Sequence, residues 1–288
     1  MKAKHPAIII PAILFILLIA GCLPETGPVR LALKFSDGQN LTWSIHTKAL
    51  VREFENDSLV NYTETSERSY ATEEVLAILN DSSARIRRTN YYAVPGGGDS
   101  LQPTDSGTVS WSAEYIQAAG GQISEFTPRD TVNPEVLAYY QKIYEQVSPN
   151  YPDRPVTPGY SWSHSVRVAL PDGRITTATT RYRVRSFGRV DGYDCVVIES
   201  QGTVVLPFSG ADRKTGISVS GQSQKDISGV TCFAYKEGFI VRYEETYDSR
   251  LEGRKRTADD EKRFAVYEKG TYSYWLTDTI ADNAMAIK

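Results

Sequence analysis

The feature that most constrains the fold is a series of long extended stretches separated by turn signals. Residues 182–187 alternate between polar and apolar side chains, which is the period of a strand with one buried face. Turn-forming residues interrupt the stretches at 56–58 (Asn-Asp-Ser) and 171–173 (Pro-Asp-Gly). With 288 residues, the chain is long enough for one large β domain or two smaller lobes. We therefore expect a mainly β protein.

The stretches follow a doubled plan. A Trp-Ser pair, at Trp43 and again at Trp162, opens a long stretch, and a hairpin turn with Gly121 or Gly238 closes each copy. The two Trp-to-Gly spacings agree to within two positions. We expect two copies, residues 31–130 and 155–250, each forming an antiparallel, curled sheet. Together they predict a half-barrel or sandwich-like pair of similar sheets.

The segment between the copies, residues 131–154, contains the best helix candidate. Asn133 can cap a helix, Pro134 suits its first position, and apolar residues recur at helical spacing as far as Val147. We expect one helix over 133–147, between the two sheets. Residues 73–79 also favour a helix by propensity. Their counterpart in the second copy alternates, so we predict a strand there.

The remaining segments are less regular. Residues 212–229 are polar and glycine-rich, which predicts a long loop or an irregular strand. Residues 251–288 predict a C-terminal hairpin and a frayed tail. The hairpin strands are expected at 263–266 and 271–276, around a turn at residues 268–270.

The N-terminus has the pattern of an export signal. Lys2 and Lys4 precede an apolar run from Ala7 to Ala20, and Gly21 and Cys22 follow it. At ~1.5 Å per residue this run is short for a bilayer core of ~30 Å, but it suits the apolar region of a secretory signal. The small residues directly before the cysteine resemble the lipobox of bacterial lipoproteins. An ordinary signal peptide, or an uncleaved anchor with an accidental cysteine, is the alternative.

The lipobox resemblance implies a membrane-anchored protein. Residues 1–21 would be removed, diacylglycerol would join the Cys22 sulfur, and a third acyl chain usually follows on the new amine; two or three chains anchor a protein stably. Leu23 stands where an aspartate would favour the inner membrane, so the resemblance implies the outer membrane if the organism has one. Residues 22–30 predict a short tether. The expected partner is the membrane, through Cys22; a protein or lipid partner stays unknown.

The whole chain also resembles a broad family of two-repeat, β-rich bacterial envelope lipoproteins. The resemblance rests on the lipobox, the two copies, the helix between them and the Pro-Val-x-Pro-Gly-x-x-Trp run from Pro155 to Trp162. The family brings no known catalytic residues. A looser similarity of architecture, to lipoprotein carriers with curled sheets, is an analogy of fold alone.

The charge balance gives no support for nucleic-acid binding. The chain has 32 basic and 35 acidic residues, a formal net charge of −3, and export would remove two of the lysines. Basic residues cluster only at 85–88 and 254–256. We interpret both clusters as solvated strand and loop faces.

The sequence offers little for catalysis. His46 and His164 lie at related places in the two copies, so they could form a paired site, but solvated strand residues are the favoured interpretation. Two histidines without a zinc motif make a poor metal site. The run from Gly159 to Ser163 lacks the second glycine of a nucleophile elbow. There is no phosphate-binding loop, and acids alone do not define a glycosidase cleft. We expect no enzyme, no cofactor and no metal.

Two cysteines would remain in the mature chain beside Cys22. Cys195 and Cys232 both sit in apolar, strand-like stretches, and export would place them where disulfides persist. The sequence leaves two alternatives open: a disulfide between these cysteines, or a pair of buried free thiols.

Aromatic residues suggest either a binding groove or an ordinary core, and the core is favoured. They are Trp43, Trp111, Trp162, Trp275, Tyr139, Tyr140, Tyr144, Tyr182, Tyr243, Tyr272 and Tyr274.

The sequence leaves three hypotheses for the function: a non-catalytic binding or structural lipoprotein, a carrier of a lipid or other apolar molecule between the sheets, or a hydrolase of envelope polymers. A cavity of a few hundred Å³ would favour the carrier, and a filled core would exclude it.

Overall fold

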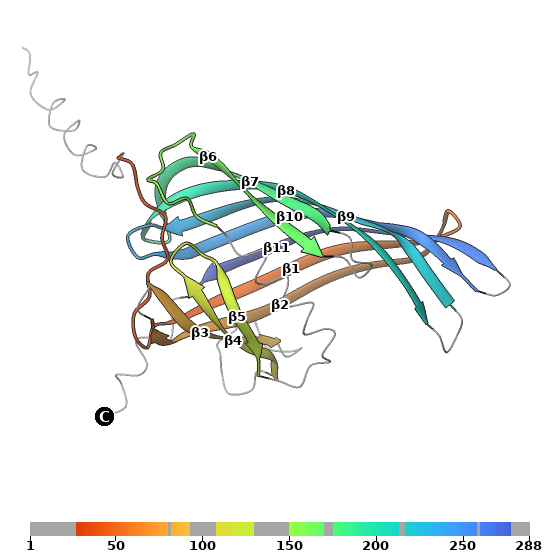
Figure 1. Ribbon diagram of the computed structural model, residues 1–288, viewed down its shortest axis with the longest axis horizontal. Coiled ribbons are helices and arrows are strands. Elements are labelled where there is room, and N and C mark those ends of the chain that lie inside the picture. Colours follow the sequence, from red (N-terminus) through yellow and green to blue (C-terminus); the bar gives the residue numbers. More distant parts are fainter. Residues whose placement is uncertain are drawn as a thin grey trace, which may run out of the picture.

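The computed structural model describes residues 27–79, 82–92, 108–129, 150–169, 175–212, 217–257 and 260–277. Within these ranges the protein is mainly β, and its strands form one antiparallel, strongly curled sheet of eleven strands (Figure 1). No helix occurs in the described ranges.

Two runs of neighbouring strands build this sheet. The first run is β1 (Asn40–Glu55), β2 (Ser58–Ile78), β3 (Ser83–Tyr92), β4 (Thr108–Ala118) and β5 (Ile123–Pro128). The second is β6 (Ser161–Ala169), β7 (Ile175–Val190), β8 (Tyr193–Asp212), β9 (Ile217–Ala234), β10 (Phe239–Arg256) and β11 (Glu261–Leu276). The order across the sheet is β5-β4-β3-β2-β1-β11-β10-β9-β8-β7-β6, so the first and last strands pair in its interior.

The expectation of two similar sheets with a helix between them is therefore wrong. The two runs are joined into one sheet by β1 and β11, which pair from Trp43 opposite Leu276 to Glu55 opposite Phe264. This pairing is possible because β11 is one continuous strand and not the hairpin expected around residues 268–270. The helix expected over 133–147 lies outside the described residues.

Residues 217–229 belong to β9 and are not a loop. They pair with β8 on one side and with β10 on the other. Two long neighbours supply hydrogen-bond partners along the whole segment, so pairing overrides a glycine-rich, polar composition. Residues 73–78 lie in β2, and the prediction of a strand there is correct.

Two tight turns follow from residues that tolerate positive φ. Asn56 and Asp57, with φ of 48° and 67°, connect β1 to β2. Asp191 and Gly192, with φ of 48° and 87°, connect β7 to β8. Positive φ at both central residues is the geometry that matches the twist of a two-residue hairpin.

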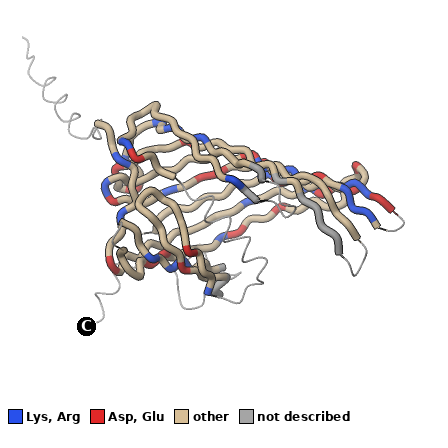
Figure 2. The backbone as a smooth tube through the Cα atoms, viewed as in Figure 1, with Lys and Arg blue, Asp and Glu red and all other residues tan. Residues whose placement is uncertain are grey.

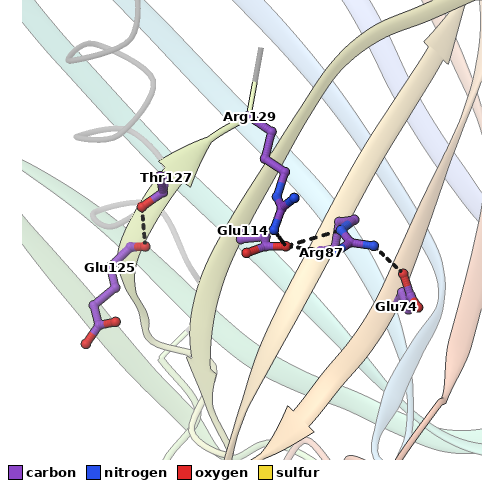
Figure 3. Close-up of polar contacts among 6 residues, drawn as sticks. All are labelled: Glu74, Arg87, Glu114, Glu125, Thr127 and Arg129. Atoms are coloured by element: carbon purple, nitrogen blue, oxygen red, sulfur yellow. Dashed lines mark hydrogen bonds and ion pairs between the residues drawn. The ribbon is translucent and has the colours of Figure 1, made fainter.

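The register divides the sheet into two faces. The inner face is defined here as the one that carries Trp43 of β1 and Tyr274 of β11, whose rings lie edge to face at 6.4 Å between centroids. The outer face carries ion pairs at the β2–β5 end, where Arg87 contacts Glu74 at 3.1 Å and Glu114 at 3.1 Å (Figure 3). Arg129 also pairs with Glu114. Figure 2 shows both signs of charge interspersed over the sheet.

A strap of N-terminal chain, residues 27–39, crosses one end of the curled sheet (Figure 1). The amide of Leu33 donates to the carbonyl of Ala119 in the β4–β5 turn at 2.8 Å, and the amide of Lys34 donates to the carbonyl of Gly238 in the β9–β10 turn at 3.0 Å. The strap therefore connects two turns that belong to opposite halves of the sheet.

A second segment, residues 150–160, closes the same end. The amide of Tyr151 donates to the carbonyl of Gly120 at 2.9 Å, and Val156 forms a bridge with Val29 of the strap. Val29, Leu31, Tyr151 and Val156 are buried in one cluster with Phe233. This packing removes apolar surface from water and seals the end of the curl.

Candidate ligand-binding chamber

A chamber of 360 Å³ lies inside the closed end of the curled sheet. The strap contributes Leu33 and Phe35 to its wall, β1 contributes Leu41 and Trp43, and β2 contributes Val75. The Trp43 indole is fixed by donation from Nε1 to the carbonyl of Ile240 at 3.3 Å. The volume falls within the range of small-molecule sites, which are typically concave and mostly apolar.

A group of three polar side chains lies in this mostly apolar wall, and we call it the Glu73 cluster. Arg88 of β3 pairs with Glu73 of β2 at 2.8 Å, and their side chains are only 20% and 18% exposed. The hydroxyl of Tyr115, from β4, donates to the same Glu73 oxygen at 2.9 Å. A charge with so little exposure needs a partner, and here the charges of Glu73 and Arg88 neutralise each other.

Tyrosines of β11 form another part of the wall. Tyr274 stacks on Tyr243 with 5.1 Å between ring centroids. Burial raises the pKa of the Tyr274 and Tyr243 hydroxyls well above the ordinary value, so both stay protonated at any physiological pH. Tyr151 reaches the chamber from the second closing segment and is only 6% exposed.

An inner groove of 290 Å³ adjoins the chamber, and Tyr272 lines both. In this groove Tyr247 donates to Glu268 at 2.6 Å, and Lys225 lies 3.6 Å from Glu245 and 4.3 Å from the centre of the Tyr247 ring. The inner face therefore changes from apolar at the closed end to polar along the middle of the strands.

The two histidines do not form a common site. His46 contacts Ser66 at 3.2 Å on the outer face, whereas His164 contacts Asn150 at 3.3 Å beside the closing segment. The paired-site hypothesis is wrong, because the two side chains lie on opposite faces of the sheet. Among the residues that the structure describes, no group of three or more His, Cys, Asp or Glu is placed to hold a metal ion.

Cys195 and Cys232 lie together as free, buried thiols. They occupy neighbouring strands two positions out of register and on the same face, since Cys232 is opposite Val197 and Cys195 is opposite Ala234. Both belong to a cluster with Ala234 and Val241. A disulfide between them stays one of the two alternatives that the sequence left open. Cys22 lies outside the described residues.

The aromatic residues divide between chamber, core and surface. Trp43, Tyr272 and Tyr274 line the chamber. Trp162 and Tyr182 stack at 5.0 Å and pack against the closing segment, whereas Trp275 is exposed on the outer face. Tyr139, Tyr140 and Tyr144 lie outside the described residues.

Sequence reasoning missed the Glu73 cluster. The basic run at 85–88 was expected to be solvated, and for Arg88 that is wrong. The available signal was strand alternation: Arg87 and Arg88 must point to opposite faces, so one of them faces the interior. The acidic pair Glu73 and Glu74 divides in the same way, and each glutamate meets one arginine across the strands.

Comparisons with known proteins add little. No family model and no curated protein matches the chain. Among solved structures, it is similar to a candidate exported protein of Bacteroides fragilis with a YmcC-like fold, at 11% identity and a TM-score of 0.31, over 86% of this chain and 99% of that one. It also aligns with the attachment invasion locus protein Ail of Yersinia pestis, at 7% identity and a TM-score of 0.11, over 83% and 100%. Scores this low support no conclusion about this chain.

The geometry itself defines the class of protein as a mainly β module with a chamber at one closed end. In the part of the chain that the structure describes, no helix has the length and apolar character needed to cross a membrane.

Proposed function

We propose that this protein is an exported, lipid-anchored envelope lipoprotein whose chamber binds a small apolar or amphipathic molecule without chemical conversion. The observation that carries the proposal is the 360 Å³ chamber, whose wall is mostly apolar and contains one ion pair of largely buried side chains, Glu73 with Arg88. A cavity of this size favours a carrier over a purely structural lipoprotein, because a structural protein would have a filled core.

The position of the chamber supports a role beside a membrane. Leu33 and Phe35, which the strap supplies to the chamber, stand 11 and 13 positions after the cysteine proposed to carry lipid. The chamber would thus be held within a short distance of the bilayer, where apolar molecules are concentrated. The chamber lies in the curl of a single sheet, so the carrier hypothesis needs no second sheet.

Blocking the chamber tests the proposal. Leu41→Trp adds a large ring to the chamber wall, and we expect it to weaken saturable binding of the neutral fluorescent probe N-phenyl-1-naphthylamine by ~10-fold or more. Leu50→Trp places the same ring on the outer face of the same strand and should leave binding unchanged. Titrations would use the chain from residue 22 with Cys22→Ser, which retains every residue that the structure describes. Absence of saturable binding by the unblocked chain, or equal binding by both variants, would refute the proposal.

A further inference from the structure

We infer that the chamber selects an uncharged amphiphile, namely a hydrocarbon chain that carries a neutral, hydroxylated head group, over a fatty acid or other anion. This inference rests on the proposed function and specifies its ligand. It comes from how the charges and hydroxyl groups of the chamber are paired.

The charges inside the chamber are already matched. The carboxylate of Glu73 has the guanidinium of Arg88 at 2.8 Å and the hydroxyl of Tyr115 at 2.9 Å. A ligand carboxylate beside Arg88 would also lie beside Glu73, and two carboxylates in one weakly hydrated site repel each other. Burying an anion that brings no counterion of its own is costly.

The adjoining groove disfavours anions as well. Its charged groups are Glu245 and Glu268 against the single ammonium of Lys225. The remaining cation of the chamber wall is Lys34, which belongs to the strap, has an exposed side chain, and donates from Nζ to the carbonyl of Lys236 at 2.5 Å. Any attraction from Lys34 acts at the rim and not in the interior.

The chamber wall does offer a neutral hydrogen-bonding group. Tyr151 lines the chamber and is 6% exposed, and its hydroxyl has no hydrogen-bond partner among the described residues. A buried hydroxyl without a partner has lost the hydrogen bond that water would give it, so a ligand oxygen placed against it would relieve that cost. Because the hydroxyl can both donate and accept, it suits an alcohol or an ester oxygen.

The test compares two probes of equal chain length, 1-dodecanoylglycerol and dodecanoate, each below its micelle concentration. Displacement of N-phenyl-1-naphthylamine should show the glyceride binding ~10-fold more tightly than the fatty acid. Tyr151→Phe removes one oxygen and keeps the ring packed, so we expect ~5-fold weaker glyceride binding with an unfolding midpoint no lower than that of the parent chain. Glu73→Gln removes the competing carboxylate, so it should tighten dodecanoate binding ~10-fold.

The outcomes separate the inference from the proposed function. If the fluorescent probe saturates the chamber but dodecanoate displaces it as well as the glyceride does, and Lys34→Gln abolishes that displacement, the head group is an anion at the rim and the inference is overturned. If Tyr151→Phe binds the glyceride as the parent chain does, the interior hydroxyl is not the recognition group, and the inference is again overturned. If no probe saturates the chamber, the proposed function itself fails.

Discussion

Adjacent arginines have different roles in β3. Arg88 faces the chamber and neutralises Glu73, whereas Arg87 faces outward and pairs with Glu74 and Glu114 (Figure 3). Glu114 also accepts from Arg129, and the hydrogen bond from Arg129 is the main reason that the pKa of Glu114 lies below its ordinary value of 4.5. The side chain of Glu114 is 15% exposed, so water and salt screen its ion pairs with Arg87 and Arg129 less than they would screen a fully exposed pair.

The pKa of Glu114 gives a prediction for stability against pH. Because the folded pKa is below the unfolded one, the contribution is complete above pH 4.5 and is lost as the pH falls through the folded pKa. Glu114→Gln should lower the free energy of unfolding by about 1 kcal/mol at pH 7, and by much less at pH 3. Urea unfolding at the two pH values measures this.

A matched control is available on β5. Glu125 pairs with Arg85 at 3.5 Å, but its side chain is 63% exposed. Glu125→Gln should therefore change stability by less than about 0.5 kcal/mol at either pH. Equal effects of the Glu114 and Glu125 variants would contradict the assignment.

The buried thiols give a second prediction at this scale. Burial raises the pKa of the Cys195 thiol to about 12, so almost none of the reactive thiolate exists at pH 8. Iodoacetamide should label Cys195 at least ~100-fold more slowly in the folded protein than in guanidinium chloride. Mass mapping checks both the rate and the redox state: a mass lower by two hydrogens, with no labelling after unfolding, would show the bridge instead.

At the scale of elements, the strap depends on one glycine. Gly238 has a φ of 80°, and a Cβ there would lie 2.5 Å from the amide nitrogen of Lys34. Gly192 has a similar φ of 87° with nothing within 4 Å of a Cβ. A side chain at either position would strain the backbone, because both glycines have a positive φ. Of the two, Gly238 is the one that contacts the strap.

Alanine at these two glycines separates the effects. Gly192→Ala should cost about 1 kcal/mol of unfolding free energy, from the left-handed backbone alone. Gly238→Ala should cost about 1–3 kcal/mol more and accelerate hydrogen exchange at the Lys34 amide, because the strap must move away. Unchanged exchange at Lys34 in the Gly238 variant would show that the strap is not held by this turn.

Most strands could be predicted from the sequence, but their neighbours could not. Alternation and turn residues indicated the start of β2 and β7 and a strand segment within each, since both signals are local. Composition misled at β9 and β11, where glycines and polar residues lie inside strands that both neighbours hold in place. Gly270 of β11 signals a turn in isolation, yet in the sheet it leaves space for the ring of Tyr247.

The candidate site was less predictable for the same reason. Glu73, Arg88 and Tyr115 come from three strands, and only the register between those strands brings them together. Tyr151 joins them from a segment outside the sheet. No spacing in the sequence shows that these residues lie close together. The aromatic residues were a partial signal, because Trp43, Tyr272 and Tyr274 were expected to lie either in the core or in a binding groove.

At the scale of the whole molecule, the proposal places the closed end of the sheet beside the bilayer. Cys22→Ala should abolish cleavage and lipid attachment, leaving an unprocessed precursor of higher mass. Mass spectrometry of membrane and soluble fractions would check this. A Cys232→Ala variant serves as control, because that thiol is buried in the sheet and should not affect processing. Normal processing and partitioning of the Cys22 variant would remove the basis for a membrane-anchored role.

Pairing of β1 with β11 also governs the order in which the chain can assemble. During synthesis β1 appears first, and one of its edges has no neighbour until the last strand of the described sequence has been made. Contacts between such distant segments make folding slow, and the exposed edge is open to wrong partners in the meantime. A nascent chain of this design would gain from a chaperone that covers β1 until β11 arrives.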